Sequence, residues 1–182
     1  MENNEQILKL LKKIKRAPNK SAANTLVKIY YREMLGYVFN RTRDKEVAMD
    51  ITQEIFVDML RSIPRFDEKK SSLRTWLYRI ASRRIADYYR GSEFRKLQLT
   101  DFEELSSMQK LEVPFATKVE INEINDFVAG LDDSRREIFQ VKIFSDLTFE
   151  QIAEITEMPV ASVKTKFYAT QKLIKKEFGE HD

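Results

Sequence analysis

The sequence predicts an all-α protein made of two small helical domains, an N-terminal bundle and a C-terminal four-helix domain. Strand-like alternation is almost absent from the 182 residues, and only four glycines and four prolines interrupt the helical patterns. Between the two helical regions lies a stretch with excess acid, scattered apolar residues and no clear periodicity, which is typical of a linker. We therefore expect domains over residues 1–91 and 119–182, joined by a flexible linker over residues 92–118.

The N-terminal region contains four segments in which apolar residues recur at helical spacing. They are about 5–16, 26–39, 45–63 and 73–90. Ser21 or Asn24 is suited to cap the second helix. The third helix is expected to end before Pro64, because a proline disfavours helical backbone at the residue before it. Residues 64–72 are polar and predict a loop, and Gly91 ends the domain.

The C-terminal region has the layout of a helix-turn-helix. Thr148 followed by Gln151 is a capping-box signature for a first helix, and Pro159 suits the start of a second one. Ser134 with Glu137 predicts a further capped helix before them. In the last helix the inward positions are Val163, Phe167, Thr170 and Ile174, and the exposed side comprises Ser162, Thr165, Lys166, Ala169 and Lys172.

Basic charge is concentrated in the N-terminal half and in the last helix. Residues 1–90 carry 20 basic and 11 acidic side chains, whereas residues 91–123 carry 4 and 7. Residues 159–176 contain five lysines and no acid. Two separate basic surfaces favour a chain that contacts a polyanion such as DNA at two places.

The chain lacks the residues that most catalytic and metal sites require. It has no cysteine and a single histidine, His181, next to the C-terminus. Its acids are distributed over helix caps and solvent faces, so we expect no enzyme, no metal and no cofactor. No apolar run approaches the roughly 18 residues of a membrane span, and the N-terminus is unlike a signal peptide. We expect a cytoplasmic protein without membrane insertion.

Two parts of the chain, in the same order as in the family, resemble the bacterial RNA polymerase sigma factors of the sigma-70 family, in its extracytoplasmic-function group. Residues 48–56, Phe66-Asp67 and residues 72–81 with Asp87-Tyr88 are similar to the second region of these proteins. Residues 131–173 are similar to the fourth region. The resemblance implies a promoter-specificity subunit, with core RNA polymerase and promoter DNA as partners and an anti-sigma factor as a regulator.

The resemblance also implies three sets of binding residues. For core polymerase they are Asp50, Gln53, Glu54 and Phe56. For the −10 promoter element they are Phe66, Asp67, Lys69, Lys70, Ser71, Ser72, Arg79, Arg83, Arg84 and Tyr88. For the −35 element they are Ser162, Lys164, Thr165, Lys166, Tyr168 and Lys172. The spacing of Asp50, Gln53 and Glu54 agrees with this, because it places them on one helical face.

Several positions leave the specificity open. Trp76 is spaced with Ile80 as a core residue, although it is also a possible stacking platform. Arg83 stands where many relatives carry asparagine, and Ala169 where relatives often carry arginine. Glu157 occupies a turn position where glycine is frequent, which predicts mild strain. The alternative function is a one-component DNA-binding regulator, which would bind duplex DNA without polymerase.

Overall fold

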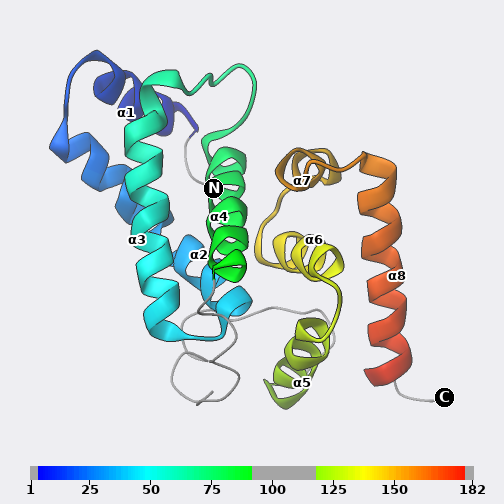
Figure 1. Ribbon diagram of the computed structural model, residues 1–182. Coiled ribbons are helices and arrows are strands. Elements are labelled where there is room, and N and C mark those ends of the chain that lie inside the picture. Colours follow the sequence, from blue (N-terminus) through cyan, green and yellow to red (C-terminus); the bar gives the residue numbers. More distant parts are fainter. Residues whose placement is uncertain (1–3, 92–117, 179–182) are drawn as a thin grey trace. The chain divides into compact units, whose positions relative to one another are not determined.

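The computed structural model describes residues 4–91 and 118–178 (Figure 1). Contacts divide the chain into two compact units, Met1–Asp101 and Phe102–Asp182. All regular structure in the described ranges is helical, so the prediction of an all-α fold with two small helical domains is confirmed. The predicted linker lies outside the described residues apart from Lys118. No helix within the described ranges has the length and apolarity needed to cross a bilayer.

The described part of the first unit, residues 4–91, contains four α-helices and one short 3₁₀ turn. They are α1 (Asn4–Arg16), α2 (Lys20–Thr42), α3 (Lys45–Ser62), η1 (Ile63–Arg65) and α4 (Leu73–Arg90). Helices α2, α3 and α4 pack against one another, and α1 packs on α2 and η1. The core between them includes Leu26, Met34, Ile55 and Leu77, which are fully buried. These side chains come from the apolar stripes seen in the sequence.

Two helix boundaries in this unit differ from expectation. Helix α2 begins earlier than predicted because Asn19 is its cap and accepts a hydrogen bond from the Ala22 N–H at 2.9 Å. Ser21 and Asn24 lie inside the helix, so the prediction that one of them is the cap was wrong. Pro64 follows the end of α3 as predicted, but the chain continues there as the 3₁₀ turn η1.

The second unit contains α5 (Lys118–Ala129), α6 (Asp133–Phe144), α7 (Phe149–Thr156) and α8 (Val160–Phe178). Helix α8 packs against each of the other three. The predicted inward positions Val163, Phe167 and Thr170 are buried, and Ile152 and Ile155 of α7 are buried with them. The order α7, turn, α8 is the predicted helix-turn-helix.

Local hydrogen bonds define the ends of these helices. The capping box predicted at Thr148 is confirmed: the Thr148 Oγ1 accepts from the Gln151 N–H, and the Gln151 side chain accepts from the Thr148 N–H at 2.9 Å. The box predicted at Ser134 was wrong, because Asp132 is the cap of α6 and the Ser134 hydroxyl donates to Asp132. Glu157 ends α7 in the left-handed conformation, with φ 55°.

Candidate functional surfaces

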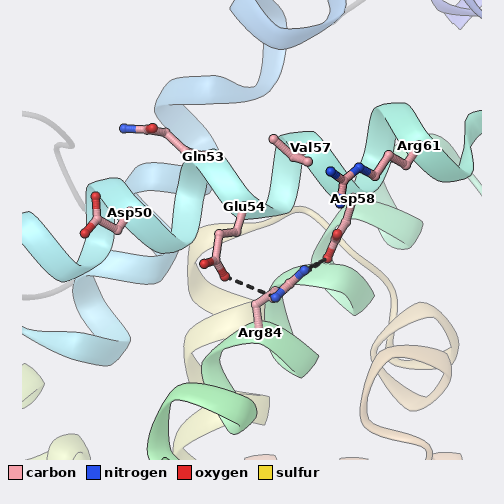
Figure 2. A pocket seen from close by; sticks show the side chains of 7 residues that line it. All are labelled: Asp50, Gln53, Glu54, Val57, Asp58, Arg61 and Arg84. Atoms are coloured by element: carbon pink, nitrogen blue, oxygen red, sulfur yellow. Dashed lines mark hydrogen bonds and ion pairs between the residues drawn. The ribbon is translucent and has the colours of Figure 1, made fainter. Parts of the chain in front are cut away.

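One face of α3 carries an exposed row of polar side chains. Asp50, Gln53 and Glu54 are all exposed on it, as their spacing predicts. Together with residues that sequence reasoning missed, they line an open groove of about 430 Å³ between α3 and α4 (Figure 2). The additional lining residues are Val57, Asp58, Arg61 and Arg84. A helical-spacing test on α3 would have found Asp58, which follows Glu54 by one turn.

Arg84 of α4 organises this groove. Its guanidinium donates to Asp58 Oδ2 at 2.5 Å and to Glu54 Oε2 at 3.1 Å (Figure 2). The pKa of Arg84 is raised, chiefly because of the hydrogen bond to Asp58. The resemblance assigned Arg84 to −10 DNA, whereas the structure places its charged group with the acids of α3. A cation held between two carboxylates fixes the direction in which both acids point.

Phe56 lies on the opposite side of α3 from this groove. Its side chain is 5% exposed, and its ring stacks on Tyr31 of α2 with the centroids 6.0 Å apart. Burial of an aromatic ring between two helices fixes their packing. Phe56 therefore supports the α3 face from behind and does not form part of the surface.

The loop between η1 and α4 presents a cluster of short polar and basic side chains. Asp67, Lys69, Lys70 and Ser72 are exposed, and Ser71 is half-buried. Asp67 Oδ1 accepts the Lys69 N–H at 3.0 Å, which folds the loop back on itself. Ser72 caps α4 by accepting from the Thr75 N–H at 3.0 Å.

Phe66 is the base of this loop. It is only 6% exposed, and its ring lies 4.7 Å from that of Trp76. Trp76 is half-buried, so it contributes to packing as its spacing with Ile80 predicted. The structure thus separates Phe66 from the exposed residues of the predicted −10 set and gives it a supporting position.

Three further predicted −10 residues follow along α4. Arg79 and Arg83 are one helical turn apart and share a face, with Arg79 half-buried and Arg83 exposed. Tyr88 is half-buried, and its ring meets that of Tyr89 edge-on at 5.4 Å. The Tyr89 hydroxyl donates to the Arg41 carbonyl, which ties Tyr89 to α2.

Helix α8 exposes most of the predicted −35 residues. Lys164, Thr165, Tyr168 and Lys172 are exposed, and Ser162 is half-buried. Lys166 is also half-buried, because its Nζ donates to the Ser134 hydroxyl at 2.9 Å. The structure therefore brings four of the six residues to the surface of one helix and draws Lys166 toward α6.

Phe149 of α7 supports two of these side chains. The Tyr168 side chain is 55% exposed, and its ring lies 5.8 Å from that of Phe149. The Lys164 Nζ is 5.7 Å from the same ring and 3.8 Å from Glu150 Oε1. Contacts of a cation and a ring with one aromatic face restrict both. Sequence reasoning did not single out Phe149, although it is the first residue after the capping threonine.

Comparison with known proteins identifies the first unit. Residues 26–95 match the family model of sigma-70 region 2. The chain is also similar to the RNA polymerase sigma factor YlaC of Bacillus subtilis (strain 168), with 27% identity over 87% of this chain and 92% of YlaC. It is similar to the ECF RNA polymerase sigma factor SigW of the same organism, with 26% identity over 96% of this chain and 97% of SigW. Residues 26–95 thus match sigma-70 region 2, and over most of its length the chain is similar to sigma factors, one of them named as an ECF sigma factor.

A solved structure has a similar fold. CnrH, solved in complex with the cytosolic domain of CnrY, matches with a TM-score of 0.69 and 16% identity, over 96% of both chains. The matches to YlaC and SigW cover 87% and 96% of this chain, far more than the region 2 model. The region 2 match occupies the part of the chain in which a one-component regulator would carry a ligand-binding or dimerisation domain.

Proposed function

We propose that this chain is an alternative sigma factor, which binds core RNA polymerase and directs it to a set of promoters. One observation carries the proposal: a single chain joins a region 2 domain, with an organised polar face on α3, to a helix-turn-helix with a basic outer helix. Residues 1–91 are then a region 2-like domain, residues 92–118 a linker and residues 119–182 a region 4-like domain. In this proposal the protein recognises polymerase and promoter DNA and catalyses no reaction itself.

The α3 face is the proposed docking surface for core polymerase. Asp50, Gln53 and Glu54 offer acceptors on one exposed face, which suits a basic partner helix. Arg84 and Asp58 complete the surface by fixing Glu54 in place. Acids already oriented by an ion pair lose less conformational freedom on binding, which favours affinity.

The loop after η1 and the exposed side of α4 are the proposed −10 reader. Opening the duplex removes a base from the stack at a cost of a few kcal/mol, which contacts to the extruded base and the backbone must offset. The loop supplies hydroxyls and ammonium groups for these contacts, and Arg79 and Arg83 supply charge for phosphates. In this assignment the buried Phe66 ring, packed beside Trp76, anchors the loop to the helices.

Helix α8 is the proposed −35 reader. Lys164 and Lys172 are placed to neutralise phosphates, while Thr165 and Tyr168 reach base edges or thymine methyl groups. Ala169 replaces the arginine frequent in relatives, which shifts recognition toward apolar contact and DNA shape. Lys166 contributes its charge from a position tied to α6.

Regulation and location follow from the same assignment. We propose that the protein acts in the cytoplasm, where polymerase and promoters are, and that an anti-sigma factor inhibits it by covering these surfaces. CnrH, of similar fold, was solved with the cytosolic domain of CnrY bound. The described groove on α3 is one surface that such a partner would need to cover.

The test is co-elution with core polymerase. The purified chain and bacterial core RNA polymerase are mixed and separated by gel filtration, and the dissociation constant is then measured by titration. We expect a one-to-one complex, which Glu54→Arg weakens by at least about tenfold, because it places a cation beside Arg84 in the docking face. Glu123→Arg makes the same charge change at an exposed site on α5 and is the control.

Two outcomes would contradict the assignment. If the wild-type chain does not co-elute with core polymerase yet binds duplex DNA alone, the sigma-factor proposal is wrong. If both variants weaken the complex equally, polymerase responds to net charge, and the α3 face is not the docking surface.

A further inference from the structure

Helix α1 is fastened to the loop after η1 by one side chain. The Lys15 Nζ donates to the Phe66 carbonyl at 2.7 Å and to Glu68 Oε2 at 2.5 Å. It also lies 5.7 Å from the centre of the Phe66 ring. The partners are more than 50 residues apart in sequence. A single ammonium group therefore joins the backbone, a ring and an acid at the start of this loop.

The position of Lys15 is itself fixed. Ile7 and Leu11 of α1 are buried, and α1 packs on both α2 and η1. The Lys15 side chain is 24% exposed and that of Glu68 is 33% exposed. A pair of this kind, partly shielded from water and anchored in a packed helix, restricts the loop more than an ion pair between two mobile surface side chains.

The contact also changes the charge that the loop presents. The loop has two acids and two lysines, and acids near DNA repel phosphates. Asp67 is engaged by the Lys69 N–H, and Glu68 by Lys15. The pKa of Glu68 is lowered, chiefly by its hydrogen bond with Lys15, so Glu68 remains ionised and paired. Lys69 and Lys70 are exposed, with the Lys70 Nζ 4.0 Å from Asp67 Oδ2.

We propose that Lys15 is a positioning residue for −10 recognition: it holds the loop 66–72 in its reading conformation and neutralises Glu68. This inference rests on the proposed function. It extends the −10 apparatus to α1, a helix that lies outside the residues matched by the region 2 model. Lys15 acts through the loop and need not contact DNA.

The test measures promoter discrimination. A promoter is selected from random DNA with core polymerase and the wild-type chain, and initiation is compared between that promoter and versions with single −10 base pairs changed. Lys15→Met keeps most of the side-chain length but removes the charge and both hydrogen bonds. We expect it to reduce the discrimination ratio on the order of tenfold, as for loss of one base readout, with polymerase binding unchanged within twofold.

Three variants separate positioning from general stability. Lys9→Met removes an exposed lysine of the same helix, which pairs with Glu5 one turn away, and is expected to discriminate as wild type. Lys15→Arg keeps a donor and a charge and is expected to restore most of the ratio. Glu68→Gln removes the ion pair from the loop side, and a smaller loss in the same direction is expected because Lys15 still binds the Phe66 carbonyl.

The outcomes are distinct from those for the function itself. The inference is overturned if Lys15→Met discriminates like the wild type, or if its discrimination falls only in step with polymerase binding or thermal stability. Failure of the wild-type chain to co-elute with core polymerase would overturn the proposed function and this inference together, and gel filtration shows that before any promoter is tested.

Discussion

The two units fix their functional surfaces by different interactions. In the first unit, beside local pairs such as Arg90 with Asp87, some ion pairs join segments far apart in sequence: Arg84 with Asp58, Arg74 with Glu33 at 2.7 Å, and Lys15 with Glu68. In the described part of the second unit, the ion pairs of α6 are local, between residues three apart, and the contact of Lys164 with Glu150 is long at 3.8 Å. Side-chain caps and a left-handed residue at a helix end are common to both units, so the ion pairs are what differs.

This difference matches the proposed partners. A protein surface has fixed complementary groups, so acids held by ion pairs are suited to it. A DNA backbone is a nearly continuous array of phosphates, to which long exposed lysines adapt. In the helix-turn-helix, α8 must therefore be held in a fixed position, whereas its lysine side chains can remain mobile.

The largest effect is expected for Arg84→Met, which tests whether a long-range ion pair stabilises the first unit. It leaves Asp58 and Glu54 adjacent without the guanidinium, and we expect it to lower the free energy of unfolding of the first unit by about 1–2 kcal/mol, between the values for exposed and buried pairs. Urea unfolding followed by the fluorescence of Trp76, the single tryptophan of the chain, reports on this unit.

The matched control for Arg84 is Arg90→Met on the same helix. Arg90 also pairs at 2.5 Å, with Asp87, but both side chains are mostly exposed, so a loss below about 0.5 kcal/mol is expected. Equal losses in the two variants would mean that the α3–α4 pair contributes no more than a surface pair.

The second prediction concerns the caps of the helix-turn-helix. Thr148→Ala removes the acceptor for the Gln151 N–H and should destabilise α7 by about 1 kcal/mol. Hydrogen exchange of the α7 amides measures this directly. Thr148→Ser keeps the acceptor and should exchange nearly as slowly as wild type; if it behaves like alanine, packing of the threonine methyl group, and not the cap, is responsible.

The third prediction concerns the turn between α7 and α8. Glu157 has φ 55°, a conformation that disfavours residues with a Cβ atom. Glu157→Gly should therefore stabilise the second unit by about 0.5–1 kcal/mol, measured by thermal unfolding followed by circular dichroism. Glu157→Ala retains the backbone cost and should give no such gain, so equal gains would point to removal of charge instead.

The smallest expected effect is the pH dependence of the α6 cap. The Asp132 pKa lies below its ordinary value of 3.8, chiefly because the Ser134 hydroxyl donates to its carboxylate. A lowered folded-state pKa contributes stability above 3.8 that is lost as pH falls through the folded value. Asp132→Asn should therefore cost a little stability at pH 7 and almost none in acid, as urea midpoints would show. A pH-independent difference would contradict this.

Local signals in the sequence were sufficient for most of the fold. The bounds of α4 agree with the apolar periodicity and its flanking residues, and the Thr148 box was predicted correctly. The caps at Asn19 and Asp132 were missed, because each competes with a neighbouring residue of equal intrinsic preference. Such choices depend on where the helix must begin in order to pack.

Long-range contacts limited the prediction of the candidate surfaces. The exposed row on α3 follows from helical spacing alone. The pairing of Arg84 across 30 residues and of Lys15 across more than 50 does not, because sequence spacing carries no information about which helices become neighbours. The resemblance placed Phe56 and Phe66 among the binding residues, yet tertiary packing buries both.

Helix α4 sets the distance between the loop after η1 and the groove on α3. Ser72 caps it beside the loop, and Arg84 engages the α3 groove twelve residues later. At about 1.5 Å per residue, this separates the two positions by roughly 18 Å along a rod that does not stretch. A partner bound at the groove is therefore held at a fixed distance from the loop. An error of a fraction of a helical turn in its position at the groove displaces the loop relative to it by the same amount.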